Sequence, residues 1–250
     1  MVQRRSVLFG MALLPLGAAT SGGLVMAQEA SADTIPTSGG DLLIHPVNHA
    51  SLVLEWGGKA IYVDPVGGAE LYANLPPADA IVITHGHQDH FHLQTLMAIA
   101  GDAKLITNQE VFDLLPPALK ANATALANGA EGSLLDIPVR AIAAHNITAD
   151  RMNYHPVGVG NGYVLSFGDV TVYVAGDTEP TDDMLALTDI TVAFVPMNLP
   201  YTMTPDQALD AINTFKPKIV YPYHFGKSDL SPLETGLDEG IELRMRNWYA

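Results

Sequence analysis

Three histidines and an aspartate stand close together in this chain, directly after a short apolar run. Residues 84–90 read THGHQDH, and residues 81–83 before them read IVI. A tight loop that leaves a buried strand can direct such side chains at one or two points in space. Imidazole and carboxylate groups together suit zinc, manganese or iron, whereas a merely solvated histidine-rich loop would need neither the strand nor the acidic residue. The heptapeptide therefore predicts a metal site.

The rest of the chain can form one large core around such a site. It has 250 residues, of which 48% are hydrophobic, and it shows neither a repeat of fixed period nor a Pro-rich or Gly/Ser-rich linker. Once a leader is removed, this length fits one domain better than two, so we expect a single domain over residues 28–250. The sequence contains no cysteine, which leaves nitrogen and oxygen atoms as the metal ligands.

The first 27 residues are typical of an export signal. Arg4 and Arg5 precede an uncharged stretch from Val7 to Ala27, which ends in residues small enough for a signal peptidase. The arginine pair resembles a twin-arginine leader, which engages the export machinery for folded proteins. We therefore expect residues 1–27 to be a signal peptide that is cleaved off. The mature protein would then be periplasmic or secreted, without a stable membrane anchor. A retained membrane anchor is the alternative.

Without this leader the chain is strongly acidic. Arg4 and Arg5 are the only charged residues of the leader, so 10 basic residues remain against 27 acidic ones, a net charge of −17. Such a field repels the phosphates of nucleic acids. The charge therefore favours a small-molecule substrate, and no nucleic acid, as the binding partner.

Apolar runs bounded by turn residues predict strands in both halves of the chain. In the first half we expect strands at residues 42–45, 52–56, 59–64, 81–84 and 104–107, and in the second half at residues 133–144, 163–167, 170–175, 191–195 and 218–221. Helices are expected from residue 92, from 108 until the prolines at 116 and 117, over 182–187, and from the capping Thr204. Two β-rich halves, each ending in alternating strands and helices, predict a four-layer α/β/β/α sandwich with the metal loops at one edge.

Three further candidate ligands each follow an apolar run. His145 follows residues 141–144, Asp177 follows residues 172–176, and His224 follows residues 219–223. One such residue alone is more often a satisfied polar side chain than a ligand. Three of them, in a chain that already carries a metal loop, favour one shared site.

With these motifs the chain resembles the metallo-β-lactamase superfamily. The motifs are the loop at 85–90, the distant His145, the Gly-Asp-Thr at 176–178 and the Tyr-His-Phe-Gly at 223–226, in an order that spans residues 41–226. Residues 49–51, 61–65 and 203–205 further resemble the compact hydrolases related to ascorbate-phosphate lactonase. The resemblance implies a hydrolase with the α/β/β/α fold and two divalent ions, Zn²⁺ first, with Mn²⁺ or Fe²⁺ as alternatives.

The resemblance also implies a role for each candidate ligand. One ion would take His85, His87 and His145, the second would take Asp89, His90 and His224, and Asp177 would bridge them. Two ions that share a hydroxide lower its pKa and hold both the attacking and the leaving oxygen, and Asp89 or Asp177 would handle the proton. Asp64, at the end of an expected strand, either orients the metal loop or is a turn residue.

Other residues are weaker candidates for the same site. His49 lies near the first strands, and His155, Tyr154, Tyr201 and Tyr223 lie in or beside loops that could overhang the metals. Each of the loop residues, taken singly, is more typical of packing than of substrate binding.

We expect hydrolysis of a carboxylic ester or a lactone, with a phosphodiester as the alternative. A chain this acidic has few cations to hold phosphate, although Arg151 or a single lysine such as Lys227 could supply a local clamp. Other functions of the superfamily fit less well. A β-lactamase of this kind usually lacks a bridging aspartate, a nuclease needs a basic surface, an oxygen-reducing diiron protein carries a flavin domain, and a non-catalytic relative loses ligands.

Overall fold

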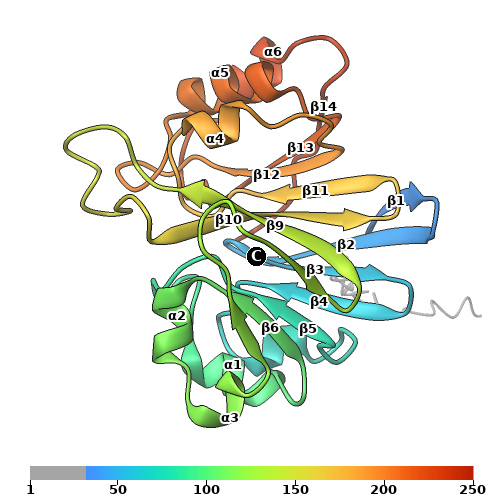
Figure 1. Cartoon of the computed structure of the whole chain (residues 1–250). Coiled ribbons are helices and arrows are strands. Elements are labelled where there is room, and N and C mark those ends of the chain that lie inside the picture. Colours follow the sequence, from blue (N-terminus) through green and yellow to red (C-terminus); the bar gives the residue numbers. More distant parts are fainter. Residues whose placement is uncertain (1–31, 250) are drawn as a thin grey trace, which may run out of the picture.

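Two seven-stranded sheets pack face to face, and helices cover the outer face of each sheet (Figure 1). The computed structural model describes residues 32–249, so the predicted signal peptide at residues 1–27 lies outside the described residues. The layers follow the order helix, sheet, sheet, helix. The predicted four-layer α/β/β/α sandwich is therefore confirmed.

The first sheet comes from the N-terminal half of the chain, and its strands lie side by side in chain order. They are β1 (Asp33–Thr37), β2 (Gly40–Asn48), β3 (Ser51–Trp56), β4 (Lys59–Val63), β5 (Ala80–Val82), β6 (Lys104–Thr107) and β7 (Ala123–Ala125). Pairing is antiparallel from β1 to β4 and parallel from β4 to β7. Parallel neighbours need crossover connections, which here contain η1 (Ala69–Tyr72), α1 (Leu93–Ile99), α2 (Gln109–Leu114) and α3 (Pro117–Lys120).

The second sheet repeats this plan with the rest of the chain. Its strands are β8 (Glu131–Leu134), β9 (Ile137–Ala144), β10 (Gly160–Phe167), β11 (Val170–Val174), β12 (Val192–Pro196), β13 (Ile219–Tyr223) and β14 (Glu242–Leu243). Pairing is antiparallel from β8 to β11 and parallel from β11 to β14. The connections in the parallel part contain α4 (Asp182–Leu185), α5 (Pro205–Phe215) and α6 (Ser231–Gly236).

Some elements differ from those predicted, each for a local reason. The β-rich stretch expected at residues 133–144 is a hairpin of two strands, because Leu135 and Asp136 adopt positive φ angles of 52° and 67° in a two-residue turn. Pro116 ends α2 as expected, but Pro117 begins α3, since proline suits the first position of a helix. Strands β1, β7 and β14 lie at sheet edges and are too short to give a periodic signal.

Apolar side chains fill three layers of the sandwich. The central layer lies between the sheets and includes Leu52, Tyr163 and Phe194. The outer layers lie between each sheet and its own helices. Strands β12 and β13 are buried along their whole length because they are covered on both faces.

Helix α5 begins where the sequence predicts. The Thr204 hydroxyl accepts the backbone N–H of Gln207, and the Gln207 side chain accepts the N–H of Thr204, which forms a capping box. Pro205 occupies the first turn. Within residues 32–249, the helices, α5 included, are too short or too polar to cross a membrane.

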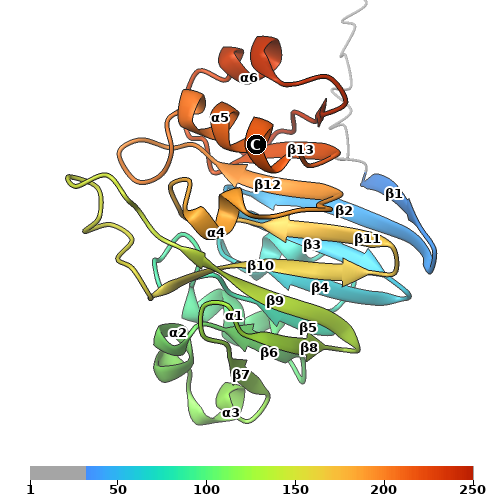
Figure 2. The ribbon, with the colours of Figure 1, turned by 45° about the horizontal axis from the view of Figure 1, so that its top comes forward.

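The loops that follow β5, β9, β11 and β13 meet at one edge of the sandwich (Figure 2). There the backbone N–H of Asn161 in β10 donates to the carbonyl of Thr84 (3.0 Å), which ties the two sheets together. This edge carries the histidines and aspartates that the sequence singles out.

Candidate metal centre

A buried aspartate at the end of β4 shapes the loop at residues 84–90. Asp64 accepts the backbone N–H of Thr84 (2.8 Å), the hydroxyl of Thr84 (2.7 Å) and the Nδ1–H of His90 (2.8 Å). Its φ of 43° turns the chain sharply out of the strand. Because Asp64 holds Nδ1 of His90, the other ring nitrogen of His90 is available to the site. Asp64 thus orients both the loop and a ligand.

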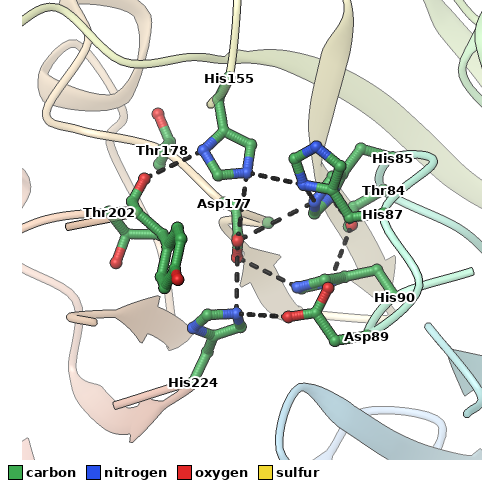
Figure 3. Close-up of polar contacts among 12 residues, drawn as sticks. Thr84, His85, His87, Asp89, His90, His155, Asp177, Thr178, Thr202 and His224 are labelled. Atoms are coloured by element: carbon green, nitrogen blue, oxygen red, sulfur yellow. Dashed lines mark hydrogen bonds and ion pairs between the residues drawn. The ribbon is translucent and has the colours of Figure 1, made fainter. Parts of the chain in front are cut away.

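The first group of candidate ligands consists of His85, His87, His155 and Asp177 (Figure 3). His87 Nδ1 lies 3.1 Å from His85 Nε2 and 3.2 Å from His155 Nε2. Asp177 Oδ2 lies 3.3 Å from His155 Nε2 and 3.9 Å from His85 Nε2. Three imidazole nitrogens and a carboxylate oxygen therefore converge on one point.

The second group consists of His49, Asp89, His90 and His224. Asp89 Oδ2 lies 3.2 Å from His49 Nε2 and 3.4 Å from His224 Nε2. Asp177 reaches this group as well, since Oδ1 lies 3.2 Å from His90 Nε2 and Oδ2 lies 3.3 Å from His224 Nε2. Figure 3 shows Asp177 at the centre, between the two groups.

These distances fit the ligands of a shared divalent ion. Ligands that lie 2.0–2.2 Å from a tetrahedral ion are separated by about 3.3–3.6 Å, and the separations above are 3.1–3.9 Å. His90 Nε2, His224 Nε2 and Asp177 Oδ1 are buried without a hydrogen-bond partner. Buried polar atoms of native proteins are rarely left in this state unless an ion or water completes them. The donor set therefore fits a metal.

Burial and neighbouring charges act in opposite directions on the pKa values of the site. Burial would raise the pKa of Asp177, but His224 and His90 hold that pKa well below its usual range. Burial would lower the pKa of His90, but Asp177 and Asp64 hold it well above its usual range. Without metal, the site therefore keeps Asp177 ionised and a proton on His90, at the place where a metal cation would supply the positive charge.

The structure brings together all but one of the ligands predicted from the sequence. Six of the seven predicted ligands lie in the two groups, and His155 occupies the place expected for His145. The backbone N–H of His145 donates to the Thr178 hydroxyl (3.1 Å), and its carbonyl accepts the N–H of Glu179 (3.0 Å). The side chain of His145 lines a separate cavity of about 210 Å³ beside Asp182.

His155 reaches the first group from a loop rather than from a strand end. The loop closes on itself where the N–H of Asn146 donates to the carbonyl of His155 (2.9 Å). The Nδ1–H of His155 donates to the carbonyl of Tyr201 (3.0 Å), which leaves Nε2 facing His87. A ligand in mid-loop has no apolar run before it, so sequence periodicity does not mark it.

A buried carboxylate anchors the same loop. Glu179 accepts the backbone N–H groups of Ile147 (2.7 Å) and Thr148 (2.6 Å) and the hydroxyl of Thr148 (2.7 Å). It also pairs with Arg151 Nη2 at 2.7 Å. Burial would raise the pKa of Glu179, but these donors lower it. The sequence shows Glu179 only as the residue after Gly176-Asp177-Thr178, and its role was not predicted.

The other candidates have different surroundings. Tyr223 is buried, and its hydroxyl accepts the N–H of Gly176 (2.9 Å), so it supports the turn before Asp177. Tyr154 and Tyr201 are exposed and pack edge to face with ring centres 5.0 Å apart. Among these weaker candidates, His49 and His155 lie in the groups described above.

The chain is similar to known proteins over most of its length. A family model described as "Beta-lactamase superfamily domain" matches residues 43–224. A metal-dependent hydrolase from Nanoarchaeum equitans is 30% identical over 186 residues, which cover 72% of this chain and 81% of the relative. A metal-dependent hydrolase from Staphylococcus saprophyticus is 32% identical over 193 residues, with coverage of 72% and 84%.

Solved structures share the architecture. A candidate metal-dependent hydrolase from Parabacteroides distasonis has a TM-score of 0.80 and 37% identity, covering 89% of this chain and 100% of that chain. A metallo hydrolase from Ignicoccus hospitalis has a TM-score of 0.66 at 23% identity, covering 84% and 96%, which is a likeness of fold alone. Because the family model matches residues 43–224, which are most of this chain, the chain belongs to the β-lactamase superfamily and has the metallo-β-lactamase fold.

Proposed function

We propose that the protein is a metal-dependent hydrolase in which two divalent ions share Asp177. The observation that carries this proposal is the position of the Asp177 carboxylate. Its Oδ2 lies 3.3 Å from His155 Nε2 in the first group, and its Oδ1 lies 3.2 Å from His90 Nε2 in the second. The relatives from Nanoarchaeum and Staphylococcus are described as metal-dependent hydrolases, which supports the same class of activity here.

Each group would hold one ion. His85, His87 and His155 would bind the first ion, and Asp89, His90 and His224 the second. We propose zinc, because imidazole and carboxylate ligands suit it, although manganese and iron accept the same ligands. When bound, such a pair of ions lowers the pKa of a water molecule and polarises the carbonyl or phosphoryl oxygen of the substrate.

Asp89 is the residue that we assign to proton transfer. Its side chain is 51% exposed, whereas that of Asp177 is 3% exposed. Burial would raise the pKa of Asp89, but the neighbouring side chains of His224 and His49 lower it, so the carboxylate is ionised at neutral pH. An ionised carboxylate in contact with solvent can accept a proton and pass it to water. Asp177 is enclosed by imidazoles and holds the geometry.

For the substrate we propose a neutral carboxylic ester or lactone. Arg151 is not available as a phosphate clamp, because its guanidinium pairs with Glu179 (2.7 Å) and donates to the carbonyl of Thr202 (2.8 Å). The two loops next to His155 instead present exposed apolar and aromatic side chains, namely Ile147, Met152, Tyr154, Val157, Leu199 and Tyr201. Such side chains suit the uncharged parts of an organic substrate.

A phosphodiester is the second candidate, because Lys227 is exposed and follows His224 closely in the chain. A side-by-side assay of the zinc-loaded protein separates the two. We expect kcat/KM for 4-nitrophenyl acetate to exceed that for bis(4-nitrophenyl) phosphate at least tenfold, or about 1.4 kcal/mol of transition-state binding. His85→Ala should abolish both activities, which excludes a contaminant.

The opposite result would change the substrate class. A tenfold preference for the phosphodiester, lost in Lys227→Ala, would assign the clamp to Lys227 and contradict the neutral substrate. In that case the ester activity of Lys227→Ala should equal that of the wild type, because Lys227 forms no ion pair with a candidate ligand among residues 32–249.

A further inference from the structure

We propose that His49 is a positioning residue that holds Asp89 in place for the second ion. This inference rests on the proposed function, because it assigns a role within the dinuclear site. His49 lies in the turn between β2 and β3, whereas Asp89 follows β5 and His224 follows β13. His49 is thus in contact with two candidate ligands, Asp89 and His224, which follow strands of different sheets.

The contact between His49 and Asp89 is a hydrogen bond. His49 Nε2 lies 3.2 Å from Asp89 Oδ2 with hydrogen-bond geometry, and an ionised carboxylate can only accept, so the ring N–H donates. By contrast, His90 Nε2 and His224 Nε2 are buried and have no hydrogen-bond partner. Within the second group, the Nε2 of His49 therefore has a partner, whereas the Nε2 atoms of His90 and His224 are open to an ion.

Asp89 needs such a partner more than the other carboxylate does. The Asp89 side chain is 51% exposed, and the Asp177 side chain, 3% exposed, is surrounded by imidazoles. A half-exposed carboxylate can rotate into solvent unless a donor holds it. Partners that hydrogen-bond a ligating carboxylate fix its orientation and strengthen metal binding.

The backbone of His49 has a conformation that is uncommon for a residue other than glycine. Its φ is 56°, in the left-handed region, and His224 has a φ of 45°. The N–H of His49 donates to the carbonyl of Trp248 (2.8 Å), and the carbonyl of His49 accepts the N–H of His224 (3.1 Å). Backbone strain of this kind concentrates at functional sites, where the surroundings maintain it.

Ring packing completes the placement. The imidazole of His49 lies against that of His224 with ring centres 3.9 Å apart, and Tyr249 packs on it at 5.6 Å. The His49 side chain is only 19% exposed. These contacts fix the ring, and the ring in turn fixes Asp89.

Calorimetric titration of zinc into the metal-free full-length protein tests the proposal without any substrate. We expect two binding steps in the wild type, of which one is weakened about 10- to 100-fold in His49→Ala and the other is unchanged. His49→Gln keeps an N–H donor at a similar reach and should restore most of the affinity. His92→Ala is the matched control, because His92 bonds to Thr95 and lies outside both groups.

A double variant separates positioning from direct ligation. If His49 acts through Asp89, then His49→Ala combined with Asp89→Asn should bind the second ion no more weakly than Asp89→Asn alone. Additive losses, with His49→Gln as weak as His49→Ala, would make His49 a ligand and overturn the proposal. An unchanged second step in His49→Ala would overturn it as well.

The failure of this proposal is distinguishable from the failure of the proposed function. Two steps in the wild type with no effect of His49→Ala would contradict the role of His49 alone. A single step in the wild type would contradict the dinuclear centre, and the role of His49 with it. Thermal melting of each variant shows whether the fold is retained.

Discussion

Two candidate ligands each depend on a neighbour that fixes the imidazole ring. Asp64 accepts Nδ1–H of His90, and the carbonyl of Tyr201 accepts Nδ1–H of His155. In both cases the remaining ring nitrogen faces the site, which is the usual arrangement around a metal ligand. The arrangement of single residues therefore favours metal binding even before any ion is considered.

The replacement of His145 by His155 can be tested with a matched pair of variants. His155→Ala should abolish activity and weaken binding of the first ion, because it removes one of three imidazoles from that group. His145→Ala should keep both, because the His145 side chain lies beside a separate cavity and only its backbone supports the turn at Thr178. Loss of zinc in His145→Ala, with retention in His155→Ala, would reverse the assignment.

Most of the candidate site could be predicted because its ligands are marked by local sequence. The loop at 84–90, Asp177 and His224 all follow apolar runs that form buried strands. His155 and Glu179 could not be found in this way. His155 lies within a loop whose path is set by Glu179, and that contact depends on tertiary structure.

Metal binding should release a proton and strengthen as the pH rises. The pKa of His90 is raised in the metal-free fold, because Asp177 and Asp64 outweigh the effect of burial. His90 must lose this proton to bind an ion. Between about pH 6 and about pH 8, zinc affinity should therefore increase, and calorimetry in buffers of different ionisation enthalpy should detect proton release. A zinc affinity that does not change with pH would contradict the predicted increase.

At the scale of elements, the loop at residues 146–155 carries the candidate ligand His155, and a buried ion pair helps to hold it. The side chains of Glu179 and Arg151 are 0% and 13% exposed and lie 2.7 Å apart. Removal of one member of a buried pair leaves the other charge without compensation. The loop therefore depends on Glu179 more strongly than a surface loop depends on its salt bridges.

Glu179→Gln should lower the free energy of unfolding by about 2–4 kcal/mol and weaken binding of the first ion through His155. Chemical denaturation and zinc titration measure the two effects. The control is Asp238→Asn, which removes an exposed pair with Lys216 and should cost less than about 1 kcal/mol. An equal loss in the free energy of unfolding for the two variants would show that Glu179 does not stabilise the loop more than a surface ion pair does.

The order of layers could be predicted because the long elements are strongly patterned, as in α5 with its capping box. Edge strands such as β1 and β14 could not, because their pairing is decided by partners distant in sequence. Asp33 at the start of β1 is held by Arg246 near the other end of the chain. A contact between residues so far apart in the sequence cannot be predicted from local sequence patterns.

At the scale of the whole molecule, the predicted leader lies outside the described residues, and periplasmic export remains a proposal supported by Arg4 and Arg5. Changing both arginines to lysine should keep the precursor in the cytoplasm if the twin-arginine machinery reads them. Fractionation of cells that express each form measures this. Export at the wild-type level would indicate the general secretory route, and an intact N-terminus in the membrane fraction would indicate an anchor.

The number of ions bound per chain tests the central claim most directly. Elemental analysis of the zinc-saturated protein should give two ions per chain, and Asp177→Ala should give fewer, because both groups lose the carboxylate that they share. One ion per chain at saturation, with no change in Asp177→Ala, would contradict the dinuclear hydrolase.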